Sequence, residues 1–238
     1  MSPETVHTVV LWSKDFSNVL MNRHGLRDLA SAYDQVYLHF TVTGLGGTSV
    51  EPGVPPLRKA LDQLADLVSF AGSPRRVSVR FDPVVFWREA GALRSNLSFF
   101  PEVAAAAARA GVKDVRTSFA QWYGKAERRA AARRFPFVDP PDEEKRARAE
   151  GLAEIALARG LTLQACCQPA LADVPGLRPS ACIDAVLLES LHPRREPASA
   201  RKDRSQRAGC RCTESKDIGS YAQACPHGCV YCYANPKT

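Results

Sequence analysis

The sequence predicts an α/β fold, a TIM-barrel-like or partial (β/α) barrel, with a cysteine-rich C-terminal segment. Short β-rich runs alternate with helical runs, which is the order of a parallel sheet with right-handed crossover helices. The length of 238 residues suits one such domain. Most of the eight cysteines lie after residue 209. We therefore expect a barrel-like domain at 1–200 and a cysteine-rich tail at 201–238 that packs on the barrel mouth.

The expected strands are runs rich in β-branched and aromatic residues, each bounded by turn residues. They cover residues 7–12, 35–43, 76–81, 114–119 and 161–166. The expected helices are rich in alanine or carry apolar residues at helical spacing. One begins at Pro55-Pro56, and the others cover residues 100–110, 142–159 and 183–191. The basic run KAERRAAARR at 125–134 is interpreted as an exposed helix face.

Composition narrows the class of protein. Hydrophobic residues make up 45% of the chain, which is enough for a full core. No run of about 18 apolar residues is present, and no secretory signal is recognisable, so we expect a cytoplasmic protein with no membrane partner. The net charge of +7 allows nucleic acid as a partner. Because arginines and aromatic residues are not interleaved, a solvated basic surface is the preferred interpretation.

The terminal motif carries the most chemistry. Cys225, Cys229 and Cys232 stand at C-x3-C-x2-C spacing, and thiolates this close on one loop can hold one iron–sulfur cluster. A structural zinc site is an alternative, because it needs only four Cys or His ligands and His227 lies within the motif. A disulfide framework is not expected in a chain of this length without a secretory signal.

With Tyr231 directly before its last cysteine, the motif resembles that of the radical S-adenosylmethionine (radical-SAM) enzymes. The run C-x3-C-x-Y-C-Y is similar to that of spore photoproduct lyase. The resemblance implies a [4Fe–4S] cluster with one open iron that binds S-adenosylmethionine, Tyr231 beside it, and an electron donor of flavodoxin or ferredoxin type. In those enzymes the motif follows the first strand of the barrel, whereas here it comes last.

The chain as a whole resembles a bacterial family of uncharacterised proteins with a C-terminal cysteine cluster of radical-SAM type. The segments that carry the resemblance are LWSKDF (11–16), LHFTVTGLG (38–46), EPGVP (51–55), VRFDP (79–83), RKDRSQRAGCRC (201–212) and SKDIGSYAQACPHGCVYCYAN (215–235). Members of that family begin with a further strand and turn, so the resemblance implies a barrel that lacks one βα unit or is open on one side.

A second candidate ligand set comes from the remaining cysteines. The strand at 161–166 delivers Cys166 and Cys167 at its C-terminal end, and Cys182 follows after a loop. The family resemblance implies a second cluster. Its ligands would be one cysteine of that pair together with Cys182, Cys210 and Cys212. Loops at one barrel mouth could bring them together. The alternative is that some of them are buried hydrophobic side chains, as free cysteines often are.

Two further features are candidates for cofactor or substrate contacts. Gly44, Gly46 and Gly47 form a glycine-rich loop after a strand, where a ligand could approach the backbone closely, although a plain flexible loop is an equal alternative. Arg80 and Asp82 stand at a strand end, where barrel enzymes place working residues. Asp82 could instead cap the following turn.

The preferred hypothesis is a radical-SAM-like iron–sulfur enzyme whose substrate the sequence does not identify. An alternative is an iron–sulfur protein that binds no S-adenosylmethionine and serves in electron transfer or redox sensing, with nucleic acid as a conceivable partner. In that case Cys210 or Cys212 would complete the terminal cluster. The third hypothesis is the structural zinc site.

Overall fold

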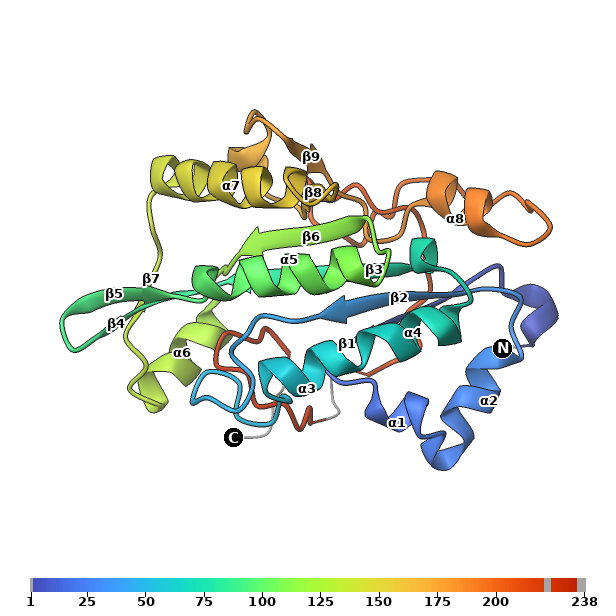
Figure 1. The fold of residues 1–238 in the computed structure, drawn as a ribbon, viewed down its shortest axis with the longest axis horizontal. Helices are drawn as coiled ribbons and strands as arrows, with labels where there is room; N and C mark the ends of the chain where they lie inside the picture. Colours follow the sequence, from blue (N-terminus) through green and yellow to red (C-terminus); the bar gives the residue numbers. More distant parts are fainter. Residues whose placement is uncertain (1, 221–223, 235–238) are drawn as a thin grey trace.

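The computed structural model describes residues 2–220 and 224–234, and its centre is a six-stranded sheet (Figure 1). Every pairing in this sheet is parallel. The strands, in their order across the sheet, are β1 (Val9–Ser13), β2 (Val36–Thr41), β3 (Val77–Val84), β6 (Asp114–Phe119), β8 (Thr162–Ala165) and β9 (Leu177–Pro179). The predicted α/β fold is confirmed, and all five expected strands form.

The sheet is open. Strands β1 and β9 are its two edges and do not pair with each other. A closed TIM barrel needs eight strands, and the parallel sheet of the described residues has six. The closed form of the expected barrel is therefore not present there. Parts of the predicted tail, residues 221–223 and 235–238, lie outside the described residues.

Helices cover one face of the sheet and bury its apolar side chains. Figure 1 shows α4, α5 and α7 along the same side of the sheet. Alternate strand residues point to opposite faces, so Leu38, Phe40, Val79 and Phe81 enter one core with these helices. The α-helices are α1 (Ser17–Leu20), α2 (Leu26–Ser31), α3 (Leu57–Asp62), α4 (Leu64–Ala71), α5 (Phe100–Arg109), α6 (Gly124–Ala132), α7 (Asp142–Leu157) and α8 (Ala185–Leu191). Short 3-10 helices occur at Pro3–Thr5, Arg23–Gly25, Pro74–Arg76, Leu97–Phe99 and Pro169–Leu171.

A small antiparallel sheet stands beside the main one and was not predicted. It consists of β4 (Phe86–Glu89), β5 (Ala92–Ser95) and β7 (Phe137–Val138), in the order β5-β4-β7. Together with α6 it helps to form a second hydrophobic cluster, which includes the buried Val230 from the terminal motif. The cysteine-rich tail is thus anchored in this second cluster through Val230.

The second face of the main sheet is polar and buried. Tyr37, His39, Ser78, Arg80 and Arg116 occupy the strand positions that alternate with the apolar ones, and each is nearly or fully buried. Buried polar groups need hydrogen-bond partners, and many of theirs come from the chain after β9. This face therefore packs against the segment that holds Ser180 and Cys182. No helix among the described residues has the length and apolar character needed to cross a bilayer.

Candidate functional site

The terminal cysteine motif forms a loop that packs on the segment after β2. The amide of Gly53 donates to the carbonyl oxygen of His227 at 3.0 Å, and the amide of Val230 donates to that of Val50 at 3.0 Å. A Cβ atom at position 53 would clash with the carbonyl oxygen of Pro226, so glycine is required for this close approach. We call residues 225–232 the cysteine loop.

Helix α6 holds the cysteine loop from the other side. Arg129 Nη1 donates to the carbonyl oxygens of Cys232 at 2.6 Å and Val230 at 3.2 Å. Arg133 Nη1 donates to the carbonyl oxygen of Gly228 at 2.7 Å. The interpretation of this basic helix as a solvated face is therefore wrong for two of its arginines. Their charge faces the loop because unpaired carbonyl oxygens there accept from them.

Cys229 is the most buried sulfur of the loop, with 5% of the residue exposed. Burial raises the pKa of its thiol to about 12, and the cation of Lys14 opposes this rise. Cys225 and Cys232 also raise the pKa of Cys229 electrostatically. Without a metal ion the Cys229 thiol stays protonated near neutral pH, and a metal that binds there must displace its proton.

A buried carboxylate lies under the loop. Glu51 Oε1 accepts hydrogen bonds from the Tyr231 hydroxyl, from Thr43 Oγ1 at 2.6 Å and from Lys14 Nζ at 3.1 Å. The Glu51 side chain is fully buried, and its Oε2 has no hydrogen-bond partner among the described residues. Lys14 follows β1 directly. The cysteine loop therefore lies beside the C-terminal ends of β1 and β2.

The glycine-rich loop after β2 packs on itself and on the 3-10 helix Leu97–Phe99. Side-chain atoms at Gly44 would clash with the ring of Phe99, and at Gly46 with the carbonyl oxygen of Pro55. Leu45, between them, is buried in the same cluster as Val230. Close packing thus accounts for Gly44 and Gly46, while contact of Gly44, Gly46 and Gly47 with a cofactor stays a prediction.

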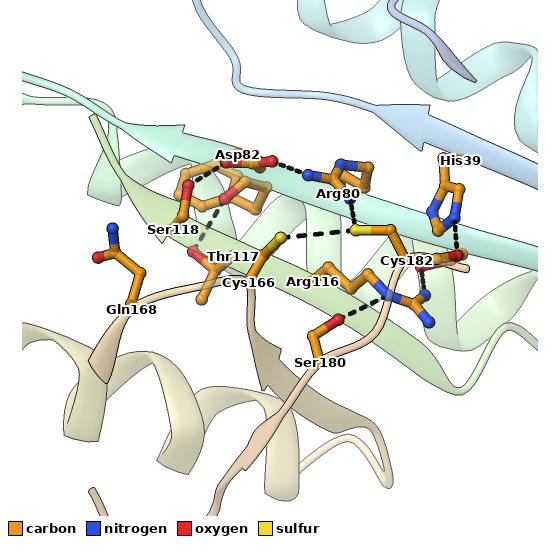
Figure 2. Close-up of polar contacts among 12 residues, drawn as sticks. His39, Arg80, Asp82, Arg116, Thr117, Ser118, Cys166, Gln168, Ser180 and Cys182 are labelled. Carbon is orange, nitrogen blue, oxygen red and sulfur yellow. Dashed lines mark hydrogen bonds and ion pairs between the residues drawn. The ribbon is translucent and has the colours of Figure 1, made fainter. Parts of the chain in front are cut away.

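A second set of sulfurs lies over the polar face of the sheet, which Figure 2 shows in part. Cys166 Sγ, just after β8, is 3.5 Å from Cys182 Sγ. Cys212 Sγ accepts the amides of Cys182 at 3.2 Å and Ile183 at 3.4 Å. Cys210 Sγ accepts the amide of Cys212 at 3.5 Å. We call Cys166, Cys182, Cys210 and Cys212 the thiol group.

The neighbouring cysteine, Cys167, points elsewhere. Its backbone has φ of 50°, and its sulfur lies beside Gly209 in a separate pocket of about 270 Å³ that Pro169 and Arg178 also line. Of the adjacent pair, Cys166 is therefore the one that joins the thiol group. Among the described residues, no three Cys, His, Asp or Glu side chains are placed to hold one metal ion.

Arg80 and Asp82, predicted at a strand end, lie beside the thiol group (Figure 2). Arg80 Nη1 donates to Cys182 Sγ at 3.0 Å, and Arg80 also pairs with Asp82, which accepts from Ser118. Hydrogen bonds from Cys166 and Cys212, helped by the Arg80 charge, lower the pKa of Cys182. The pKa of Cys166 rises, first through its hydrogen bond to Cys182 and then through burial. Of the pair Cys166 and Cys182, Cys182 is therefore the thiol that ionises first.

Two further buried groups face the same region. Arg116 donates to Ser180 Oγ at 2.9 Å, to the hydroxyls of Tyr37 and Ser78, and to the carbonyl oxygen of Ala181 at 3.3 Å. No carboxylate of the described residues pairs with it. His39 Nε2 lies 2.9 Å from the carbonyl oxygen of Cys182. Burial, followed by the charges of Arg116 and Arg80, lowers the pKa of His39, so its imidazole is neutral.

The carboxylate of Asp82 contributes to the pKa shifts of one residue in each cysteine site. Burial and the Glu51 charge raise the pKa of Tyr231, and Asp82 adds to that rise. The same carboxylate contributes to the raised pKa of Cys166. One side chain thus acts electrostatically on a residue of the cysteine loop and on a member of the thiol group.

A family model described as a domain of unknown function (DUF1848) matches residues 1–234. The chain belongs to this family. The predicted membership of an uncharacterised family is thereby confirmed. No curated protein and no solved structure matches the chain.

The DUF1848 chain brings the predicted site residues together in two places. The cysteine loop holds Cys225, Cys229 and Cys232 next to the glycine-rich loop, and the thiol group lies next to Arg80 and Asp82. Sequence reasoning missed the buried or half-buried charges that surround them, which are Lys14, Glu51, Arg116, Arg129 and Arg133. Lys14 and Glu51 lie in segments that carry the family resemblance, and that position could have marked them as site residues. The arginines gave no such signal, because their partners are mostly distant carbonyl and hydroxyl groups.

Proposed function

We propose that this DUF1848 protein is an iron–sulfur enzyme of the radical-SAM type, with a [4Fe–4S] cluster on Cys225, Cys229 and Cys232. The observation that carries the proposal is the position of the cysteine loop beside the ends of β1 and β2, against Lys14 and Glu51. The motif comes last in the sequence but lies next to the first strand of the sheet. That is the neighbourhood in which the resembling enzymes carry theirs.

The donor set fits such a cluster. Three thiols on one loop provide ligands for three irons and leave a fourth iron open. Cys212 and Cys210, the other conceivable ligands, are engaged in the thiol group with Cys182. This arrangement favours the proposal over an iron–sulfur protein in which one of them completes the terminal cluster.

The chain's own residues have definite tasks under this proposal. Arg129 and Arg133 fix the loop backbone through its carbonyl oxygens, and the charge of Lys14 favours the thiolate form of Cys229. Tyr231, half-buried, donates its hydroxyl hydrogen bond to Glu51 and so covers that carboxylate from the side of the loop. Radical chemistry is supplied by the cofactors, and the reduced cluster would deliver the electron that cleaves S-adenosylmethionine to a 5′-deoxyadenosyl radical.

We assign to Glu51 the role of accepting a hydrogen bond from the amino group of S-adenosylmethionine. Its Oε2 is buried and lacks a hydrogen-bond partner among the described residues, and such an oxygen favours a ligand that brings a donor. Its Oε1 is already held by Lys14, Thr43 and Tyr231, so the carboxylate is fixed in orientation. Arg80 and Asp82 stand nearby for the substrate, and the electron donor is of flavodoxin or ferredoxin type.

The test uses protein that is purified and reconstituted without air. With dithionite and S-adenosylmethionine it should form 5′-deoxyadenosine, detected by mass spectrometry, and S-adenosylmethionine should change the electron paramagnetic resonance of the reduced cluster. The variant Cys229→Ser should lose both signals, while Cys167→Ser, outside both sulfur sites, should keep them. An intact cluster that gives neither signal, or protein that contains zinc and no iron, would overturn the proposal.

A further inference from the structure

Two sulfurs over the polar face of the sheet lie close enough to react with each other. Cys166 Sγ is 3.5 Å from Cys182 Sγ (Figure 2). The contact follows from the sheet, because β8 and β9 pair in parallel with Ala165 opposite Pro179, and each cysteine comes shortly after its strand. The sulfurs of a disulfide are about 2.0 Å apart, so a bond between these two requires an approach of about 1.5 Å.

The spacing of this pair suits two thiols rather than two metal ligands. In an iron–sulfur cluster each thiolate binds its own iron, so the anionic sulfurs are held further apart than the 3.5 Å found here. Within the part of the chain that the structure describes, no three Cys, His, Asp or Glu side chains are placed for one metal ion. A thiol and a thiolate at this separation are instead joined by one S–H···S hydrogen bond.

Arg80 gives the two sulfurs different roles. Its Nη1 donates to Cys182 Sγ at 3.0 Å, and its charge favours the thiolate of that cysteine. Arg116, buried on the same face, has only hydroxyl and carbonyl partners among the described residues, so negative charge on Cys182 also offsets positive charge there. Cys182 is therefore the nucleophile of the pair, and Cys166 is the thiol that donates to it.

The other two members of the thiol group hold the pair in place. Cys212 Sγ accepts the amides of Cys182 and Ile183 at 3.2 and 3.4 Å, which fixes the backbone of the nucleophile. Cys210 and Cys212 are both buried, whereas Cys166 and Cys182 are half-buried. Partly exposed cysteines in electropositive surroundings are reactive and buried ones are inert, so an oxidant in solution meets the pair first.

We propose that Cys166 and Cys182 are a redox-active dithiol, which small disulfides such as oxidised glutathione convert to an intramolecular disulfide. The site takes part in thiol–disulfide exchange, an activity separate from the chemistry of the cysteine loop.

The exchange has two steps. The Cys182 thiolate attacks one sulfur of the small disulfide, forms a mixed disulfide and releases one small thiolate, which takes the proton of Cys166. The Cys166 sulfur then attacks Cys182 Sγ and expels the second small thiolate, which takes from water the proton that Cys182 lost when it ionised. In total the protein gives up two electrons and two protons, and the small disulfide becomes two thiols.

Closure of the disulfide would act on the polar face. It would tie the end of β8 to the segment whose Ser180 hydroxyl accepts from Arg116. It would also remove the thiolate that Arg80 faces, so the oxidation state of the pair would reach the ion pair of Arg80 with Asp82.

The experiment exposes full-length protein, prepared without air, to a series of ratios of reduced to oxidised glutathione. The protein is denatured, free thiols are blocked with N-ethylmaleimide, disulfides are reduced, and the thiols released receive a second label that mass spectrometry locates. We expect the second label on Cys166 and Cys182 together, at the same ratio, while Cys167 and Cys212 carry the first.

Adjacent cysteines provide a matched pair of variants. Cys166→Ser removes the second attacking thiol, so Cys182 should accumulate as the mixed disulfide with glutathione. Cys167→Ser should form the same intramolecular disulfide as the unchanged protein. Arg80→Gln, added to Cys166→Ser, should slow formation of the mixed disulfide roughly tenfold, because the thiolate loses a charged donor. Far-ultraviolet circular dichroism checks that each variant is folded.

Three results would overturn the inference: protection of both thiols at every ratio, as a bound metal would give; a disulfide from Cys182 to Cys212 in place of Cys166; or folded Cys166→Ser protein without a glutathione adduct on Cys182. The proposed function fails by a different result, the absence of 5′-deoxyadenosine from the unchanged protein. Labelling of the dithiol does not depend on that result.

Discussion

The guanidinium of Arg129 donates a 2.6 Å hydrogen bond to the main-chain carbonyl oxygen of Cys232. These residues are 103 positions apart in the sequence, and the contact ties helix α6 to the last cysteine of the loop. The same side chain also reaches the carbonyl oxygens of Val230 and Ala234. One arginine therefore fixes three peptide groups of the segment that carries the cysteine loop.

Removal of the Arg129 side chain should weaken the retention of iron by the cysteine loop. Hydrogen bonds to charged groups contribute about 2 kcal/mol, which corresponds to roughly 30-fold in an equilibrium constant. Arg129→Ala should therefore lower the chelator concentration that removes iron from the cysteine loop by about that factor. The measurement follows iron release at increasing chelator concentration under anaerobic conditions. Arg128→Ala, an exposed neighbour on α6, is the control and should behave as the unchanged protein. Equal retention in both variants would contradict a clamping role.

Gly53 should be intolerant of any side chain. A Cβ atom there would clash with the carbonyl oxygen of Pro226, which cannot move without displacing the cysteine loop. Gly53→Ala should therefore reduce iron incorporation several-fold and lower the thermal unfolding temperature. Gly151→Ala is the matched control, because no atom lies within 4 Å of the new methyl group. Within helix α7 that change should stabilise the protein by about 1 kcal/mol.

The sequence predicts the strands of the main sheet well, because each is a compact apolar run between turn residues. Asp114–Phe119 has the predicted bounds, and the other four differ by at most three residues at either end. The β4–β5 hairpin was missed. Its turn residues Ala90 and Gly91 both have positive φ, and Glu-Ala-Gly lacks the Asn-Gly or Asp-Gly signal that marks such turns.

The polar face was visible in the sequence but was not recognised. In β2 and β3, Tyr37, His39, Ser78 and Arg80 alternate with apolar residues, and a strand of that pattern has one face that needs polar partners. Those partners could not be predicted, because Cys182, which accepts from Arg80, lies 102 positions away from it in a segment without regular structure. Local patterns give the faces of a sheet, whereas tertiary contacts decide what covers them.

Lys14 and Glu51 should be coupled energetically. Their ion pair, 3.1 Å long, is nearly buried, and breaking such a pair costs about 3 kcal/mol because the remaining charge is left alone. Glu51→Gln should therefore lower the free energy of unfolding by about that amount. The double variant Lys14→Met with Glu51→Gln should recover part of it, since neither charge is then buried. Urea titrations of the unchanged protein, the two single variants and the double variant give the coupling energy. Strictly additive losses of unfolding free energy would argue against coupling.

His192 should make the fold sensitive to mild acid. Its side chain is almost completely buried against His7, with a ring-centroid distance of 4.5 Å. Burial, followed by the charge of His7, lowers its pKa below the ordinary value of 6.5. The unfolded chain therefore binds a proton near pH 6.5 that the folded chain resists. The contribution of neutral His192 to the free energy of unfolding is fully present above that pH. It decreases as the pH falls toward the pKa of His192 in the folded protein.

The contribution of His192 to this slope is at most one proton, or about 1.4 kcal/mol per pH unit. Replacement by Phe keeps a ring in the same space and removes the titration, and Nε2 has no hydrogen-bond partner to lose among the described residues. His192→Phe should therefore flatten the decline in unfolding free energy between pH 7 and pH 5.5, measured by urea titration. His24→Asn, at an exposed position with positive φ that Asn tolerates, should leave the decline unchanged. A decline of equal steepness in His192→Phe and the unchanged protein would assign the acid sensitivity to other groups.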